Sequence, residues 1–515
     1  MQGAEATTLP AGAETRSTRD LSADIAAFTR RSSRRYNRAR TSLKDLFTDL
    51  YSYGLALGCA VALATSVVVT VKDALPGRGE AGSLRISDHW PTIPAPALWT
   101  LTVYAALTTV MILARRMGPI TVQGAEGQWW LPLPVDRRPM VLPAFLRRCI
   151  LLGLASAAAF MPFSVLTSAE LTLPAHLLGS ATFGAVAVVS VGLAAWMQLE
   201  PINPRPGRLA GAVALIPCAV LPSLTNSPWA LMVAAVSAVV LLGAAASRAG
   251  QVRGADLIRG GAVAGHARSS LFFMDTNELL RALHGDRPIG SAHRAAGFYA
   301  RPARGPVAAL FRADIVAFLR LQSSLALPLS WLGIVVAVLL VEKSLPALAQ
   351  IGVIAIAGCA VASSTGTVAR RTALVPGLDA LLPVSPLWIR CSRALMPALV
   401  MILWMTCLTG ILVLLGAAPP ALILLGALAG IGMGAGAVRG ATRPVSDWSV
   451  PPVETPFGPI PQAQIGSLLR GPDFTVLALA PVQVSLYAGD VHTAAIIIQA
   501  LISAGTLGLV IRRSP

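Results

Sequence analysis

The sequence predicts an all-α integral membrane protein with about 12 transmembrane helices, arranged as two parallel repeats of six. Of the 515 residues, 55% are hydrophobic and 13% are charged, and the mean hydropathy is +0.67. A soluble domain of ordinary composition carries about 25% charged residues. Apolar runs of about 20 residues, the length that crosses a bilayer as a helix, recur along the chain. A short loop sequence also occurs twice, once in each half of the chain.

The first segment, 1–50, is polar and basic, where a secretory signal peptide would place an apolar core. We therefore expect no signal peptide but a cytoplasmic segment. Within it, residues 22–50 combine many arginines with apolar residues at helical spacing, which predicts an amphipathic helix on the inner leaflet. A merely solvated helix beside the membrane is the alternative.

Twelve segments are apolar and long enough to span the bilayer. They are 51–71, 97–114, 149–167, 175–197, 209–225, 228–247, 323–341, 345–369, 394–416, 419–438, 474–489 and 492–511. The first six form one half, 51–247, and the last six form the other, 323–511. Residues 248–322 form a cytoplasmic linker that ends in a second amphipathic helix near 306–322, and 512–515 form a cytoplasmic tail.

The distribution of basic residues predicts the orientation. If the N-terminus is cytoplasmic, only four of the 41 Lys and Arg residues lie outside, namely Lys72, Arg78, Arg85 and Lys343. This bias places both termini in the cytoplasm and the protein in the cell (plasma) membrane. The net charge of +17 is then a topology signal, and no nucleic-acid partner is expected. Because each half has an even number of spans, the two repeats run parallel.

The repeated loop follows the second span of each half. The first copy reads LPLPVDRR over 131–138, and the second reads LLPVSPLW over 381–388. The span before the first copy ends in Arg115-Arg116, and the one before the second ends in Arg370-Arg371. Proline disfavours helix at the residue before it, so we expect each loop to break before a short helix, over 135–148 and 384–393, parallel to the membrane.

Proline and glycine mark two further features. The fifth span of each half contains proline, at Pro217 and Pro222 and at Pro481. Helix breaks at equivalent places in two repeats indicate a transport pathway, although kinks satisfied by neighbouring helices are the alternative. The tenth span carries glycines at four-residue spacing, which predicts close helix packing, at Gly426, Gly430 and Gly434.

Motifs for catalysis are missing from the sequence. None of Lys44, Lys72 and Lys343 follows a glycine, so there is no P-loop, and there is no HExxH, GxSxG or CxxC. We predict no catalytic residue, no cofactor and no metal site, and the protein is not expected to be an enzyme. Acidic residues are scarce in the middle of the spans, which argues against a carrier driven by protons or sodium ions.

Together these features resemble the membrane subunit of an ABC-2-type exporter with its two six-span halves fused. In that class an amphipathic interface helix begins each half, and the loop after the second span contacts a cytoplasmic ATPase. The resemblance implies that the ATPase-coupling residues are Leu131, Leu133, Pro134, Val135, Asp136, Arg137 and Arg138 in the first loop and Leu382, Pro383, Val384 and Ser385 in the second. Since only the first copy keeps the arginine pair, we expect it to contact the ATPase more strongly.

The chain also resembles a family of actinobacterial multi-spanning membrane proteins with the patterns VETPFGPIP, here 453–461, and GPD, here 471–473. The exporter resemblance implies a permease driven by a separate ABC ATPase, present as a dimer. Because the spans carry few polar groups, an amphiphilic substrate is expected. A non-transporting membrane scaffold or accessory protein and an ATP-independent carrier are the alternatives.

Overall fold

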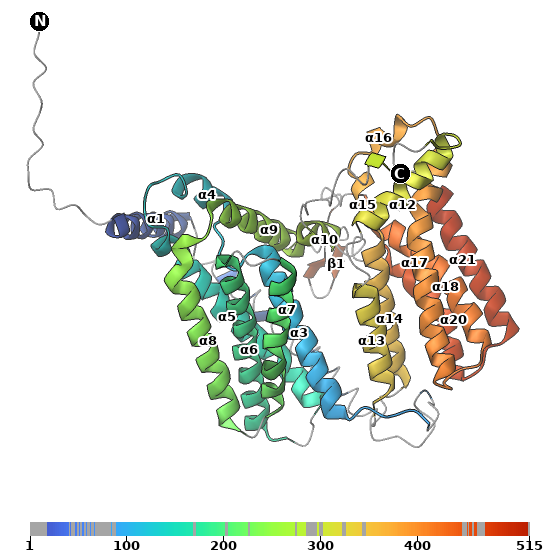
Figure 1. Ribbon diagram of the computed structural model, residues 1–515, viewed down its shortest axis with the longest axis horizontal. Helices are drawn as coiled ribbons and strands as arrows, with labels where there is room; N and C mark the ends of the chain where they lie inside the picture. Colours follow the sequence, from blue (N-terminus) through green and yellow to red (C-terminus); the bar gives the residue numbers. More distant parts are fainter. Residues whose placement is uncertain are drawn as a thin grey trace, which may run out of the picture. The chain divides into compact units, whose positions relative to one another are not determined.

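The protein is an assembly of helices (Figure 1). The computed structural model describes residues 18–40, isolated positions between 42 and 84, 89–167, 171–200, 204–224, 227–272, 276–284, 296–297, 302–321, 326–341, 347–444, parts of 451–460, and 469–512. Among these, seven helices are long and apolar enough to cross a membrane, in agreement with the predicted all-α membrane class. They are Ala95–Met117, Arg138–Val165, Leu173–Leu199, Pro228–Gln251, Pro386–Leu414, Ala421–Ala441 and Thr493–Arg512.

The described helices are too short to cross a bilayer at several of the twelve segments. Three apolar helices have 10 to 17 residues, namely Leu209–Ser223, Leu327–Leu339 and Ala349–Thr365. The helix over the eleventh segment, Pro472–Ala488, has 17 residues. The expected first span, 51–71, and the outer loop 72–96 lie largely outside the described residues.

The chain divides into two compact units. Unit 1 comprises residues 1–72 and 100–265, and unit 2 comprises 73–99 and 266–515. The predicted linker 248–322 therefore does not stand apart, because its first part belongs to unit 1 and its remainder to unit 2.

Unit 1 is built around one buried helix, α6 (Leu173–Leu199), which packs against its neighbours α5, α7 and α8. Its elements are α1 (Thr18–Arg40), most of α3 (Ala95–Met117), α4 (Gly124–Trp130), α5 (Arg138–Thr167), α6, α7 (Pro204–Val220), the 3-10 turn η1 (Leu221–Ser223), α8 (Pro228–Arg248), the turn η2 (Ala249–Gln251) and the first part of α9 (Gly254–Phe272). At the crossing of α5 and α6, a Cβ added to Gly184 would lie 2.5 Å from the carbonyl oxygen of Gly153. Two backbones thus meet where neither residue has a side chain.

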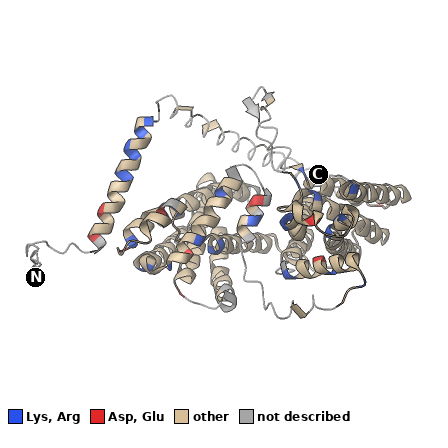
Figure 2. Cartoon of the chain, turned by 90° about the horizontal axis from the view of Figure 1, so that it is seen from above, with Lys and Arg blue, Asp and Glu red and all other residues tan. Residues whose placement is uncertain are grey.

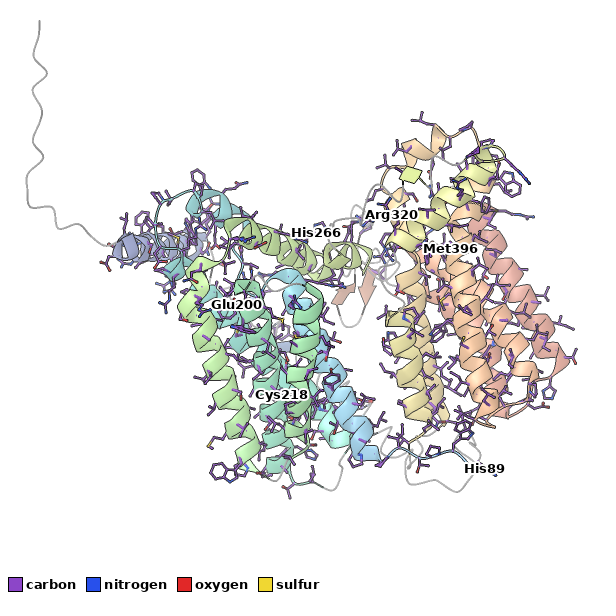
Figure 3. The ribbon with its side chains drawn as sticks, in the orientation of Figure 1. His89, Glu200, Cys218, His266, Arg320 and Met396 are labelled. Atoms are coloured by element: carbon purple, nitrogen blue, oxygen red, sulfur yellow. The ribbon has the colours of Figure 1, made fainter. Side chains whose placement is uncertain are left out.

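Unit 2 is built in the same way around α18 (Ala421–Ala441), which packs against α17, α20 and α21. Its helices are α10 (Thr276–His284), α12 (Pro306–Leu321), α13 (Ala326–Leu339), α14 (Ala347–Thr365), α15 (Thr367–Thr372), α16 (Pro376–Ala380), α17 (Pro386–Leu414), α18, α20 (Pro472–Ala488) and α21 (Thr493–Arg512). In Figure 3, Arg320 marks the end of this unit that carries α16, and His89 lies at the opposite end.

The three spaced glycines of α18 face α17. A Cβ would lie 2.5 Å from the Cγ2 of Thr409 at Gly426, 2.5 Å from the Cα of Ile402 at Gly430, and 2.5 Å from the Cα of Ala398 at Gly434. Each distance is far shorter than a van der Waals contact between carbons. The glycines thus permit α18 to lie directly on the backbone of α17.

The two expected amphipathic helices differ in what their faces contact. The last ten residues of α1 are all exposed, and arginines run along the helix (Figure 2). In α12, Leu310, Asp314 and Phe318 are buried at helical spacing, and the helix packs against α15 and α17. One face of α12 therefore belongs to the core of unit 2.

The expectation of separate short helices after the repeated loops is wrong. Residues 138–148 form the first turns of α5, which continues to Thr167, and residues 386–393 form the first turns of α17. Pro139 and Pro386 stand within the first helical turn, where no intrahelical N–H bond is needed, so they start a helix instead of ending one. The short helices precede each loop instead, as α4 and α16.

One segment departs from the helical pattern. The VETPFGPIP stretch contains two short antiparallel strands, β1 (Val453–Thr455) and β2 (Gly458–Ile460), with Val453 opposite Ile460. The β-branched residues and the prolines of this stretch disfavour a helix.

Candidate functional site: the two Leu-Pro-Val loops

The two copies of the repeated loop have the same backbone turn. The N–H of Val135 donates to the carbonyl of Leu133 (2.9 Å), and the N–H of Val384 donates to the carbonyl of Leu382 (2.8 Å). Each bond closes a three-residue γ-turn with proline at its centre, and the fixed φ of proline suits the inverse form of that turn. The aligned residues therefore take equivalent positions in both units.

The match extends to the residues before each turn. The N–H of Leu133 donates to the carbonyl of Trp130 (3.1 Å), and the N–H of Leu382 donates to the carbonyl of Asp379 (3.3 Å). In both units the order is a short helix, the turn, and then a long apolar helix: α4 to α5 in unit 1 and α16 to α17 in unit 2. The preceding arginine pairs lie in the last turns of α3 and α15.

Each turn presents an apolar side chain to its surroundings. Leu133 and Leu382 are both 37% exposed, and Pro134 and Pro383 are exposed beside them. In unit 2 the exposed apolar surface is larger. It includes Leu374, Val375, Leu378, Leu381, Leu387 and Trp388, with Leu381 79% exposed. In unit 1, Trp129 is the corresponding large exposed side chain, at 75%.

Within the first loop, the side chain of Arg137 and the backbone of Arg138 bond to the loop itself. Arg137 Nη2 donates to the carbonyl of Leu131 (3.4 Å), and the Asp136 carboxylate accepts the N–H of Arg138 (2.9 Å). Leu131, Arg137 and Arg138 are only partly exposed. These residues brace the first turn, so the surface that both loops share is the Leu-Pro tip.

The first loop rests on η2, and the segment that leads into it rests on the N-terminal part of α9. A Cβ at Gly250 would lie 3.0 Å from an Asp136 carboxylate oxygen, and one at Gly261 would lie 1.8 Å from the carbonyl of Val122. The backbone of Ile120 is held in turn by the Gln198 side chain, through bonds of 3.2 Å and 3.0 Å. Backbone contact at glycines thus fixes the segment that leads into the loop.

The second loop is held by buried charges. Arg393 of α17 pairs with Asp314 of α12 and also with Asp379 of α16 (3.2 Å), and Ser392 donates to Asp314 (2.6 Å). The pKa of the Asp314 carboxyl is raised from its ordinary value because burial outweighs the opposing effects of Ser392 and Arg393. The cluster therefore connects α12, α16 and α17 of unit 2.

The proline positions do not produce equivalent helix breaks. Pro217 lies inside the continuous helix α7, and Pro481 lies buried inside the continuous helix α20. Only at Pro222 does the α-helix give way to the turn η1. The flanking Leu479 and Val482 belong to the core of unit 2, so Pro481 is a packing position in the bundle.

Two sets of contacts that support the loops were not predicted from the sequence. The glycines of η2 and α9, at 250, 254, 260 and 261, are each unremarkable alone, although four glycines within 12 residues were a usable signal. The pairing of Asp314 with Arg393 joins residues far apart along the chain, and an acidic residue in an otherwise basic amphipathic helix was its one sign. Among the residues that the structure describes, no group of three or more His, Cys, Asp or Glu side chains could hold a metal ion.

Comparisons with known proteins give one family. No curated protein and no solved structure matches the chain. The model of the family of unknown function DUF6297 matches residues 94–451, which include both Leu-Pro-Val loops and end before the β1–β2 hairpin. Because that match spans more than half of the sequence, the chain belongs to the DUF6297 family.

Proposed function

We propose that the protein is the membrane permease of an ATP-driven exporter, whose two Leu-Pro-Val loops receive a separate cytoplasmic ABC ATPase. The observation that carries the proposal is the identical turn in both loops, with leucines of equal exposure at its tip. A duplicated surface suits a partner that is itself a dimer, since each protomer can engage one copy.

The packing of the two units supports an internal repeat. In each unit the fourth predicted span is the buried centre, since 72% of the apolar stretch of α6 and 67% of that of α18 are buried. Each central helix packs against the third, fifth and sixth spans of its own unit. A parallel six-helix repeat gives both loops the same place relative to the bilayer.

The charge at the helix ends supports a cytoplasmic position for both loops. Basic residues occupy the last turns of α3, α8, α15, α18 and α21. By the positive-inside rule, the C-terminal ends of these five helices face the cytoplasm. An ATPase that supplies the P-loop missing from this chain would meet the loops there.

The apolar tips indicate how the ATPase would bind. Leucine and proline held in a rigid turn lose little conformational entropy on binding, so the loops favour docking into a groove of the partner. The arginine pair led us to expect stronger ATPase binding by the first loop. Because the second loop exposes more apolar surface, we propose that it contributes at least equally to ATPase binding. An amphiphilic substrate remains the class that best suits the apolar spans.

The test is co-purification of the full chain with a P-loop ATPase that carries an ABC signature and is encoded in a neighbouring reading frame. Leu133→Asp combined with Leu382→Asp should lower complex formation on the order of tenfold or more, because removing a central apolar anchor costs about 2 kcal/mol. Leu469→Asp is the matched control, since Leu469 is also a surface leucine (59% exposed) but lies before α20, outside both loops and outside the twelve predicted spans.

Two outcomes would contradict parts of this proposal. An unchanged complex with the double variant would exclude docking through the loops. A complex whose ATP hydrolysis is indifferent to this chain would favour the non-transporting scaffold.

A further inference from the structure

The helix α1 carries its positive charge in its second half. Six arginines stand between residues 30 and 40, and the acidic residues of the helix, Asp20 and Asp24, lie in its first half. No acidic residue follows until Asp45. The second half of α1 is therefore a purely cationic segment (Figure 2).

Three of the arginines lie on the face of α1 opposite its buried side chains. α1 packs against α5, and its buried residues among those described are Ser22 and Ala26, at 0% and 2% exposure. Successive residues of a helix are about 100° apart around its axis. Arg31, Arg35 and Arg38 therefore fall on the side opposite the buried pair and form an arginine stripe that points away from α5.

The arginine stripe has no partner within the described part of the chain. Its three side chains are exposed, and none of them has an ion pair or a hydrogen bond with a described residue. The neighbouring arginines are engaged locally instead. Arg30 Nε donates to the carbonyl of Ala26 (3.0 Å), and Arg40 stacks over the ring of Tyr36 (4.4 Å).

The spacing of the arginines weakens the helix on its own. Like charges four residues apart on a helix repel and destabilise it. Three pairs have this spacing, namely Arg30 with Arg34, Arg31 with Arg35, and Arg34 with Arg38. A partner with several negative charges would remove this repulsion, so the cationic half of α1 gains stability from a polyanion.

The place of α1 in the chain selects the kind of polyanion. The helix ends at Arg40, and the predicted first span begins at 51, so a connection of about ten residues, at most ~35 Å when extended, joins it to the bilayer. Clusters of about four to eight Lys or Arg directly beside a span bind anionic lipid headgroups. Phe28, three residues before Arg31 on the same face, is 72% exposed, and an aromatic ring is favourable at the membrane interface.

We propose that the arginine stripe of α1 binds anionic headgroups of the leaflet that the first span enters. The contact is electrostatic, because residues 30–40 are all exposed and only Tyr36 and Ala39 among them are not polar. This differs from the inserted apolar face that the pattern of 22–50 predicted. The proposal needs the predicted span 51–71 but no ATPase, so it is tested apart from the exporter proposal.

Hydrogen exchange of the full chain in nanodiscs tests the proposal. One set contains dioleoyl phosphatidylcholine alone, and the other an equal mixture with dioleoyl phosphatidylglycerol, which adds negative charge and keeps the tails. Exchange across 30–40 should be on the order of tenfold slower in the anionic nanodiscs, since each arginine near an anionic surface contributes roughly a fivefold factor. High salt should remove the difference. The buried helix α6 is the internal reference and should exchange alike in both lipids.

The test variant combines Arg31→Gln, Arg35→Gln and Arg38→Gln. Glutamine suits a helix and relieves the like-charge repulsion, so α1 should stay folded. The measured quantity is the ratio of exchange rates between the two lipids, which the test variant should bring close to one. The matched control combines Arg253→Gln, Arg259→Gln and Arg268→Gln, which removes the same charge from exposed positions just before and within α9 and should keep the wild-type ratio.

Four outcomes would overturn the proposal. Wild type could exchange equally in both lipids, or the test variant could keep the wild-type ratio. If the control loses the ratio together with the test variant, the effect belongs to the total charge of the chain and not to the stripe. If single-stranded RNA slows exchange across 30–40 in zwitterionic nanodiscs and anionic lipid does not, the partner is a nucleic acid.

Discussion

The two Leu-Pro-Val loops share one turn but are supported in different ways. In unit 1 the turn and the segment before it lie on η2 and α9 through glycine contacts, and Arg137 donates to the Leu131 carbonyl. In unit 2 the turn is tied to α12 and α17 by the cluster of Asp314, Arg393 and Asp379. The same backbone turn is therefore supported by close packing in unit 1 and by charge pairing in unit 2.

This difference separates what each loop tolerates. Close backbone packing is sensitive to added volume and indifferent to pH, whereas a buried ion pair is sensitive to the loss of either partner and to protonation. Perturbations chosen for one support should therefore leave the other loop unchanged.

Arg393→Met should have the largest effect. It leaves the Asp314 carboxylate buried without its cation, which costs on the order of 3 kcal/mol. Hydrogen exchange should rise across 374–388 and stay unchanged across 129–137. Arg390→Met is the control, because Arg390 donates to the carbonyl of Ile511 (3.0 Å) and should cost less. Faster exchange in both loops would show that the two supports are not independent.

Gly261→Ala should have the next largest effect and the opposite distribution. Its Cβ would lie 1.8 Å from the Val122 carbonyl oxygen, so the backbone must shift, at about 1–3 kcal/mol. Gly265→Ala, four residues further along α9, meets nothing within 4 Å and should be neutral or stabilising. Thermal unfolding and hydrogen exchange across 118–137 measure both. A similar loss in both variants would contradict the role of the close contact.

A change of pH should affect only the support of the second loop, with a smaller effect on stability than the two substitutions above. Folding raises the pKa of Asp314. At pH values between the ordinary carboxyl pKa and this raised pKa, the folded protein therefore binds more protons than the unfolded chain. Stability from this group is greatest below that window and falls as pH rises through the raised pKa. Wild type should therefore lose stability relative to Asp314→Asn as pH rises from 4, measured by denaturant unfolding in detergent. A constant difference would mean that Arg393 keeps the carboxylate ionised throughout.

Pro134→Ala and Pro383→Ala should have small effects of equal size. Each removes the residue that fixes φ at the centre of the turn, which loosens the unfolded chain and costs about 0.4–1 kcal/mol. Amide exchange at Val135 and Val384 should increase to the same extent. Unequal effects would indicate that one turn is held by its surroundings more than by its proline.

Local patterns predicted much of what the structure shows. Hydropathy located the long helices, the Leu-Pro-Val match located equivalent turns, and the glycine spacing of α18 located its contact with α17. The sequence did not distinguish a proline that starts a helix from one that ends it, so α5 and α17 were each divided wrongly. The supports of the two loops were missed because they join distant segments, such as α12 with α17, whose contact no local pattern records.

The unbroken helix after each turn has a mechanical consequence. At about 1.5 Å per residue, the 30 residues of α5 and the 29 of α17 form rods of roughly 45 Å, each starting directly behind its turn. The internal prolines, Pro143 and Pro162 in α5 and Pro397 in α17, are the positions at which these helices can bend. A push on a Leu-Pro tip would therefore be passed along a continuous helix, and the loop and the first turns of the helix behind it would move together.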